Sequence, residues 1–345
     1  MNSSSIIKNS IRVFEFDVLR VIAVLAVIML HVSANLVINY EQNSTEFIIG
    51  NFFDSISRFA VPFFVMISGH FMLDEKKLMP ISKIKNKIAK LVLLLMFWSC
   101  FYALIYNFHN FLPAFLYGHY HLWYLYLIIG LYLMISVLRL FVKENNARYV
   151  YYCILLGIVF SFFPNLLNAF FAPEKATKLA AMFQVPIGGY LVYYLMGWSF
   201  HLNKDLIKRN SVKFLLCFIS LITIFCCTQF VHSNYYKAYK IFYNSINIPV
   251  LIYSVSLFSL IYSILHKYSE QFCSKFKSFI SECSSLTLGV YLIHASFLHL
   301  YVSIFKHMHH GILYVLLLFV LTVISSFITA FIISKIKYLK QLIKI

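Results

Sequence analysis

The chain has 345 residues, of which 61% are apolar or aromatic and 12% are charged, and its mean hydropathy is +0.80. This composition excludes a soluble globular domain, because soluble domains carry about twice that share of charged residues. The net charge of +17 would also suit a nucleic-acid-binding protein, so the positions of the cations must decide between that class and a membrane protein.

Apolar runs follow one another along the chain, each long enough to cross a hydrocarbon layer about 30 Å thick as a helix. They cover approximately residues 14–38, 47–73, 88–107, 121–142, 149–171, 183–200, 211–231, 246–266, 283–305 and 311–334. Membrane strands would alternate polar and apolar residues, and these runs do not. We therefore predict an all-α fold, a polytopic bundle of about ten transmembrane helices that forms one integral-membrane domain over residues 1–345.

Most lysines and arginines lie in alternate loops between these runs. The cations in the other loops are Lys175, Lys178, Lys237, Lys240 and Lys306. By the positive-inside rule this distribution predicts that both termini are cytoplasmic. Topology thus explains the basic charge, and we expect no nucleic acid as a partner. We interpret the first run as an uncleaved signal-anchor, because it is long and contains ionisable groups.

The first run, "FDVLRVIAVLAVIMLHVS", contains three ionisable residues on one helical stripe. Asp17 and Arg20 are three residues apart, and His31 follows Arg20 after three turns, about 16 Å along the axis. Charges at mid-membrane cost about 2.5–3.5 kcal/mol on insertion scales, so such residues usually mark a site. The alternatives are an interfacial ion pair, with Arg20 reaching the headgroups, and a His31 bonded to a neighbouring helix.

The second run contains "DSISRFAVPFFVMISGH", which places Arg58 close to the middle of the membrane. Asp54, four residues earlier, is its natural counter-ion, so a purely structural ion pair is the alternative to a functional role. Pro62 is expected to bend the helix at this point. Ser68 and Gly69 are small and predict close helix packing.

The fourth run opens with "GHYHLWYLY", and the ninth contains "GVYLIHASFLH". His119, His121 and Trp123 lie at the predicted outer interface, where ring nitrogens suit sugar hydroxyls and an indole face suits a sugar ring. Trp123 is otherwise an ordinary interfacial anchor. His294 lies near mid-membrane, and Tyr291 lies one turn before it. Each of the two is either a pocket residue or a core residue whose hydrogen bonds are satisfied within the protein.

Neither the cysteines nor the "HMHH" segment predicts a metal site. The seven cysteines show no C-x-x-C spacing, so they are expected to act as small apolar residues. We interpret His307, His309 and His310 as part of a surface loop. The expectation is therefore no metal and no bound cofactor.

Together these residues indicate proton-transfer chemistry on an anionic substrate. Histidine is the side chain best suited to general base catalysis near pH 7. The lysines of "SKIKNKIAK", which enter the third run, are either phosphate ligands or ordinary positive-inside charge. The sequence thus predicts a path from a cytoplasmic phosphate-bearing donor, through a buried histidine, to an aromatic outer pocket.

Four stretches also resemble the membrane-bound acyltransferase-3 family, in the order that the family has them. These are "FDVLRVIAVLAVIMLH" with its Arg-x10-His spacing, "SRFAVPFFVMISGHFML", "HLWYLYLIIGLYL" and "LGVYLIHASFL". The resemblance covers nearly the whole chain. Within the family, the sequence most resembles the branch that contains the enterobacterial common antigen O-acetyltransferase.

The resemblance implies an O-acyltransferase, most simply an O-acetyltransferase, in the bacterial cytoplasmic (inner) membrane. It would move an acyl group from acetyl-CoA or another acyl-CoA, as co-substrate, to a hydroxyl of a cell-envelope or surface polysaccharide. His31 is then the catalytic residue and Arg20 contacts the donor. The family's R-x-x-R element appears here as Lys87-Ile-Ala-Lys90, which keeps the charge but loses bidentate geometry.

These inferences define three candidate groups of residues. The expected catalytic group is His31, Arg20, Asp17 and Arg58; the acyl-CoA group is Arg20, Lys87 and Lys90; the acceptor group is His119, His121, Trp123, Tyr291 and His294. Expected partners are the acyl-CoA donor, an envelope glycan and membrane lipids. The alternatives are a flippase or transporter of lipid-linked sugars, against which the lack of visible repeats counts, and a glycan-binding sensor without turnover.

Overall fold

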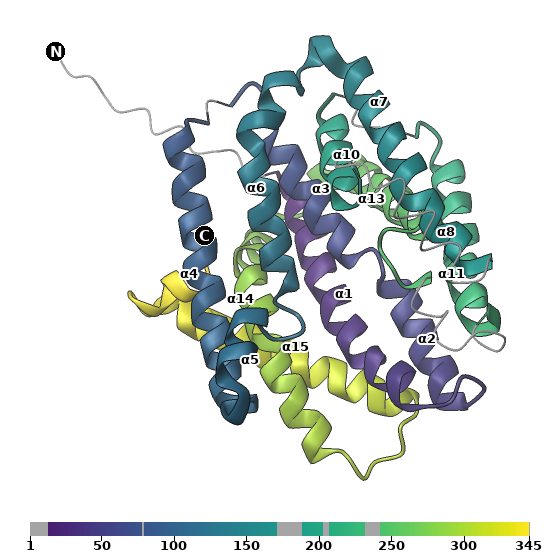
Figure 1. The fold of residues 1–345 in the computed structure, drawn as a ribbon, viewed down its shortest axis with the longest axis vertical. Helices are drawn as coiled ribbons and strands as arrows, with labels where there is room; N and C mark the ends of the chain where they lie inside the picture. Colours follow the sequence, from purple (N-terminus) through teal and green to yellow (C-terminus); the bar gives the residue numbers. More distant parts are fainter. Residues whose placement is uncertain (1–12, 78, 171–187, 203–206, 232–241, 345) are drawn as a thin grey trace.

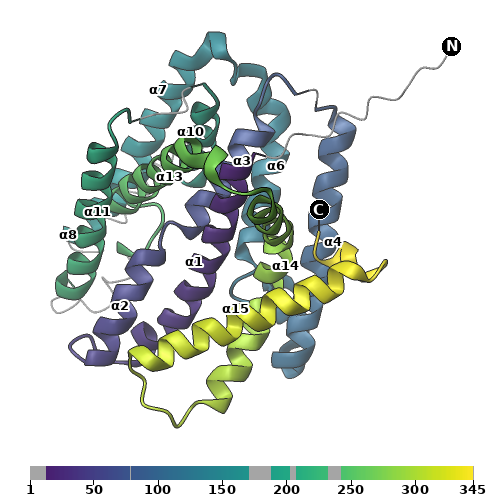
Figure 2. The same cartoon turned by 180° about the vertical axis from the view of Figure 1, so that it is seen from behind.

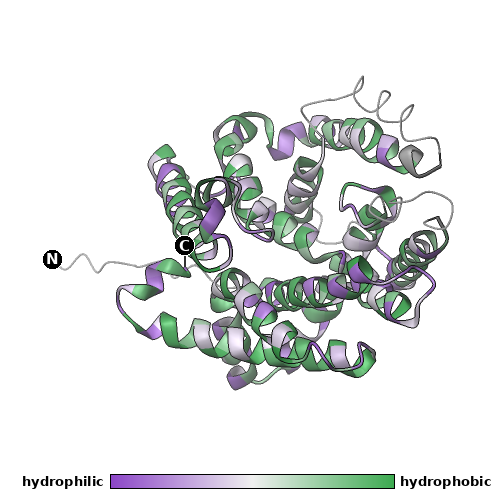
Figure 3. Cartoon of the chain, turned by 60° about the horizontal axis from the view of Figure 1, so that its bottom comes forward, coloured by the Kyte–Doolittle hydropathy of each residue, from purple (hydrophilic) through white to green (hydrophobic). Residues whose placement is uncertain are grey.

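The computed structural model describes residues 13–77, 79–170, 188–202, 207–231 and 242–344. Within these ranges the chain is helical and has no strand (Figure 1), which confirms the predicted all-α fold. Nine helical segments of the described residues are long and apolar enough to cross a membrane, and among them Thr45–Met72 and Glu144–Leu166 each join consecutive helices. Apolar residues cover most of the helical ribbon (Figure 3). The predicted outer-loop cations Lys175, Lys178, Lys237 and Lys240 lie outside the described residues.

The helices follow the predicted runs closely. They are α1 (Phe14–Asn39), α2 (Thr45–Ser57), α3 (Ala60–Met72), α4 (Ile81–Tyr106), α5 (Phe111–Tyr117), α6 (Trp123–Phe141), α7 (Ala147–Gly157), α8 (Phe163–Phe170), α10 (Tyr190–Leu202), α11 (Asn210–Val231), α13 (Ile248–Tyr268), α14 (Ser274–Ile304) and α15 (Ile312–Lys335). The predicted sixth run, residues 183–200, begins outside the described residues and continues into α10. The 13 residues of α10 extend for about 20 Å, less than the thickness of a bilayer core.

The second predicted span is two helices, with a break at Arg58 and Phe59. Pro62 explains the position of the break, because its nitrogen has no hydrogen to donate to the carbonyl of Arg58 four residues earlier. The bend predicted at Pro62 is therefore confirmed. The break sets Arg58 at a helix end in the middle of the bundle.

The first helix lies in the middle of the bundle, with α4, α6 and α14 on one flank and α2, α11 and α13 on the other (Figures 1 and 2). Asp17 contacts Ser284 and His31 contacts His294, so α1 and α14 run in the same direction. Phe16 near the start of α1 stacks on His70 near the end of α3. The third helix is therefore antiparallel to both.

Close packing of α3 on α10 depends on two glycines. A Cβ at Gly69 would lie 1.9 Å from the backbone oxygen of Tyr194, and a Cβ at Gly197 would lie 2.0 Å from the backbone oxygen of Met66. The packing role predicted for Gly69 is thus confirmed. The prediction for Ser68 is wrong, because its side chain lines a cavity instead.

Arg139 of α6 closes the end of α3. Its guanidinium donates hydrogen bonds to the carbonyls of Met72 (2.9 Å), Asp74 (3.0 Å) and Lys77 (2.6 Å). The Met72 carbonyl belongs to the last turn of α3, where it has no partner within the helix, and Asp74 and Lys77 follow in the loop. We call this part of the bundle, around Asp74, Lys77 and Arg139, the basic end.

Candidate active site

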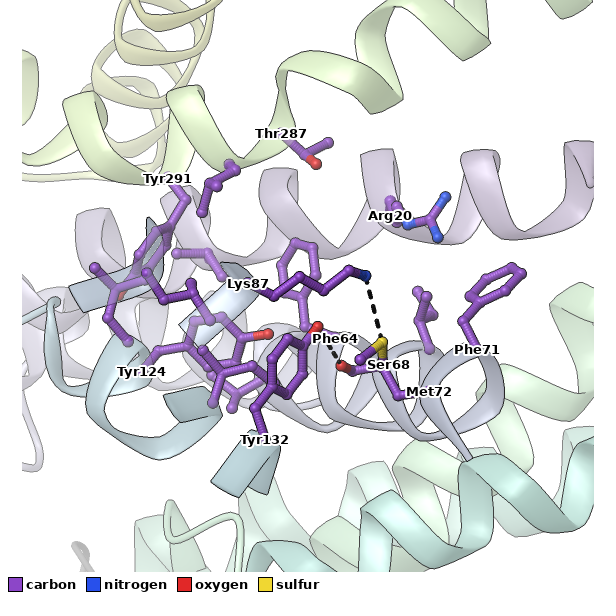
Figure 4. Close-up of a pocket in the computed structure, with 17 residues that line it drawn as sticks. Arg20, Phe64, Ser68, Phe71, Met72, Lys87, Tyr124, Tyr132, Thr287 and Tyr291 are labelled. Atoms are coloured by element: carbon purple, nitrogen blue, oxygen red, sulfur yellow. Dashed lines mark hydrogen bonds between the residues drawn. The ribbon is translucent and has the colours of Figure 1, made fainter. Parts of the chain in front are cut away.

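Five helices, α1, α3, α4, α6 and α14, enclose a cavity of about 400 Å³. The wall is mostly apolar, with Arg20 and Lys87 as its cations and the hydroxyl groups of Ser68, Tyr124 and Tyr132 along its length. Figure 4 shows Arg20 toward one end of the cavity, with Tyr124 and Tyr291 gathered toward the other. The cavity is therefore charged at one end and aromatic at the other.

Arg20 and two lysines surround the last turn of α3 at the charged end of the cavity. The Arg20 Cζ atom lies 5.1 Å from the centre of the Phe71 ring, and the Lys77 Nζ atom lies 4.8 Å from the same centre. Lys87 places its Nζ atom 3.5 Å from the Met72 Sδ atom. Three cations thus gather at the basic end, and an anionic ligand would be attracted there. Sequence reasoning did not select Lys77, because a loop lysine beside a span is typical of any cytoplasmic face.

Asp17 orients Arg20 and does not line the cavity. Its Oδ1 atom accepts a hydrogen bond from Arg20 (3.0 Å) and another from the Ser284 hydroxyl (2.7 Å). The Asp17 residue is 3% exposed, so a buried carboxylate links α1 to α14 and fixes the guanidinium. The place of Asp17 in the predicted catalytic group stays a prediction.

The two lysines of the K-x-x-K element have different surroundings. Lys87 lines the cavity, whereas Lys90, three residues later on α4, does not. The structure therefore does not bring Lys90 together with Arg20. Of this pair, Lys87 is the lysine in a position to contact a ligand in the cavity.

His31 and His294 stack at the aromatic end. Their ring centroids are 5.3 Å apart with an angle of 23° between the planes, and the Tyr120 ring lies 5.1 Å from His31. Val27 and Tyr291, one turn before the two histidines on α1 and α14, line the cavity. The cavity thus extends from Arg20 to within one helical turn of this histidine pair, and neither His31 nor His294 is among the residues that line it.

His119 and His121 reach the same cluster from the loop before α6. Gly118 has a φ of +70°, a backbone conformation that glycine adopts without strain, and it turns the chain so that both imidazoles face inward. Their Nδ1 atoms are 2.9 Å apart. The His121 ring lies 5.1 Å from His294. Four of the predicted site histidines are therefore neighbours in space.

Burial keeps the loop histidines neutral. It lowers the pKa of His119 to about 4, and the neighbouring His299 and His294 act in the same direction. Burial also lowers the pKa of His121 well below its usual value. At pH 7 both imidazoles are therefore uncharged, and each has one N–H donor and one acceptor nitrogen. Such a pair suits hydroxyl groups better than anions.

Tyr102 and His299 complete the cluster and were missed by sequence reasoning. The Tyr102 ring stacks on His119 at 4.4 Å and lies 4.9 Å from His121, while its hydroxyl donates to the carbonyl of Leu292. His299 lies 5.3 Å from His119. Tyr102 is one of many aromatic residues in an apolar run, so no signal in the sequence distinguishes it. His299 could have been found from the sequence, because it is a second histidine in the ninth run, five residues after His294.

Arg58 and Trp123 do not line the cavity. Arg58 pairs with Asp54, donates to the carbonyl of Tyr243 (2.8 Å) and has its Cζ atom 4.1 Å from the centre of the Tyr243 ring. Trp123 is 41% exposed and packs against Tyr190 at 5.6 Å. The counter-ion predicted for Arg58 is confirmed. Trp123 is close to His121 in sequence, at the start of α6, but its ring packs against Tyr190 and not against the histidines.

Among the described residues, no group of three histidine, cysteine or acidic side chains has the geometry to hold a metal ion. In the "HMHH" segment, His310 contacts the Tyr40 hydroxyl at 2.6 Å, and His309 lies 3.9 Å from Glu46. These contacts connect the loop before α15 to the end of α1 and the start of α2. They are separate from the cavity.

Comparison with known proteins gives one match. A family model described as an acyltransferase domain matches residues 13–331. No curated protein and no solved structure matches the chain. The matched region includes all five helices of the cavity.

Proposed function

Because the chain belongs to the acyltransferase-3 family, we propose that this multi-pass membrane acyltransferase transfers an acyl group from acyl-CoA to a hydroxyl of a cell-envelope glycan. The observation that carries the proposal is a cavity that extends from Arg20 and Lys87 to Val27 and Tyr291, one helical turn before the stacked His31 and His294. A polar phosphate-bearing donor with an elongated arm fits this distribution of charge. Acetyl is the simplest acyl group for a cavity of about 400 Å³.

The donor enters at the basic end. Its phosphates would contact Arg20, Lys77 and Lys87, of which Arg20 is held by Asp17. Lysines bind phosphate as point charges, so the missing R-x-x-R arginines reduce geometric specificity without removing attraction. The arm then extends about 16 Å along α1 from Arg20 to His31. This orientation also assigns the basic end to the cytoplasm, in agreement with the positive-inside rule.

The acceptor binds on the opposite side of the histidine pair. The neutral imidazoles of His119 and His121 are suited to binding glycan hydroxyls, and Tyr120, which is exposed beside His119, supplies an aromatic face for a sugar ring. Trp123 would contact a more distant part of the glycan. The acceptor hydroxyl reaches the thioester carbonyl beside His31.

His31 carries the acyl transfer. It either removes the proton of the acceptor hydroxyl directly or first takes the acyl group on its imidazole. Arg58 contributes positive charge toward the developing oxyanion, from its position beside Asp54 at the break between α2 and α3. The bacterial cytoplasmic membrane, where cytoplasmic acyl-CoA and envelope glycan meet on opposite faces, is the proposed location.

Mass spectrometry of envelope polysaccharide tests the proposal in cells. Strains with and without the gene should differ by the mass of one acyl group per modified sugar, and the size of the difference identifies the group. A flippase would instead change the amount of exported glycan at constant composition. Identical acylation in both strains would contradict the proposal.

A further inference from the structure

His294 is the one histidine among the described residues whose ring contacts that of His31. It is fully buried on α14. Its Nδ1 atom lies 2.6 Å from the carbonyl oxygen of Tyr291, which can only accept, so Nδ1 carries the hydrogen. In a neutral imidazole the lone pair is then on Nε2. The backbone of α14 therefore fixes the tautomer of this ring.

The Nε2 atom of His294 is a buried acceptor with no hydrogen-bond partner among the described residues. Leaving such an atom unpaired costs free energy, so a buried acceptor without a hydrogen-bond partner needs an explanation, such as ligand binding or a catalytic role. A hydroxyl group supplies the O–H donor that Nε2 lacks. His121 also has a buried Nε2 atom without a partner in the described part of the chain, but its ring contacts His294 and not His31.

We propose that His294 is the general base of the acceptor half of the reaction, acting beside an acyl group carried by His31. This inference rests on the proposed function and adds a second catalytic histidine to it. It also selects the covalent route. A histidine that carries the acyl group is a much weaker base, because the acyl group withdraws electron density from the other ring nitrogen, so a second base must stand beside it.

In the first step a nitrogen of His31 forms a bond with the thioester carbonyl carbon and the C–S bond breaks. The proton on the other His31 nitrogen passes to the thiolate, which leaves as free CoA. In the second step the acceptor oxygen forms a bond with the acyl carbon while Nε2 of His294 takes the hydroxyl proton. The bond between carbon and the His31 nitrogen breaks, and the proton passes from His294 to His31.

The His294→Asn variant separates the two steps. The asparagine amide places an N–H group near the position of Nδ1, so the hydrogen bond to the Tyr291 carbonyl is preserved while Nε2 is lost. Purified protein with radiolabelled acetyl-CoA should still release about one equivalent of CoA and retain the label on His31. Transfer to envelope glycan should fall at least about 100-fold, the lower range for loss of a general base.

His266→Gln is the matched control. His266 lies on α13 and pairs with Glu15 at 2.8 Å, away from the cavity. This variant should transfer label to glycan like the wild type and retain none on the protein. Glycan transfer by His294→Asn within about threefold of the wild type would overturn the inference. So would a folded His294→Asn protein that neither releases CoA nor carries label. If the wild type itself transfers no label, the proposed function fails first.

Discussion

His31 on α1 lies 5.3 Å from His294 on α14, ring centre to ring centre, and the two rings are nearly parallel. The two helices run in the same direction and meet again at Asp17 and Ser284, near the basic end. Each helix thus contributes one residue to a contact at the charged end and one to the contact at the reactive end. Under the proposed function, the cavity along α1 would connect donor recognition with acyl transfer.

Replacing Asp17 by Asn should weaken donor binding more than it slows turnover. Asparagine keeps an acceptor for Ser284 but removes the charge that holds Arg20 at 3.0 Å. We expect KM for acyl-CoA to rise about tenfold, which corresponds to about 1.4 kcal/mol, with kcat changed by less than about threefold. Glu15→Gln is the control, since Glu15 pairs with His266. A wild-type KM in Asp17→Asn would exclude a role for this ion pair.

Lys87→Met and Lys90→Met should differ in their effect on the donor. Lys87 lines the cavity and Lys90 does not, although both belong to the same K-x-x-K element. Steady-state kinetics with acyl-CoA should show at least a tenfold larger KM for Lys87→Met and about a twofold change for Lys90→Met. Equal effects would mean that general surface charge, and not the cavity, attracts the donor.

Gly118→Ala should destabilise the protein, whereas Gly130→Ala should not. Gly118 has a φ of +70° and a ψ of 168°, a region that essentially only glycine adopts, where alanine is strained by about 1–3 kcal/mol, and its Cβ would lie 3.2 Å from the Ser99 Oγ atom. Gly130 lies within α6, and a Cβ added there would have nothing within 4 Å, so alanine at this position favours the helix. Thermal unfolding in detergent measures both. An unchanged Tm for Gly118→Ala would show that the turn before His119 does not require glycine.

Acid should destabilise the wild type partly through His119. Burial lowers the pKa of His119 to about 4, while an unfolded histidine has a pKa of about 6.5. Between these values the unfolded chain binds a proton that the folded chain does not, so stability falls as pH decreases from about 6.5 toward 4. His119→Gln should therefore lose less Tm between pH 7.5 and pH 5. An equal loss in both proteins would contradict a buried neutral His119.

Much of the fold was predictable because hydropathy marks the part of each helix that lies in lipid. Helix ends were less predictable. Hydropathy places the third run at 88–107 and the ninth at 283–305, whereas α4 begins at Ile81 and α14 at Ser274. Both helices continue past the apolar region into polar and basic residues, which hydropathy does not count as membrane. Pro62 was the exception, since its missing N–H fixes the break four residues earlier.

The candidate site was predictable where helical spacing determines it. The stripe from Arg20 to His31 needed only 3.6 residues per turn. Contacts between helices were not predictable, because a single sequence does not say which faces meet. For this reason sequence reasoning grouped Lys90 with Lys87, did not distinguish Tyr102 from other aromatic residues, and did not foresee the approach of His294 to His31.

The most direct measurement is the transfer of radiolabelled acetyl from acetyl-CoA to envelope glycan by purified protein, with His31→Ala as the comparison. Both proteins should elute as folded monodisperse species and bind the donor, because His31 is not among the residues that line the cavity with Arg20 and Lys87. We expect the wild type to label the glycan and His31→Ala to lose this activity by at least about 100-fold. Equal labelling by the two proteins would contradict the assignment of His31 as the residue that carries acyl transfer.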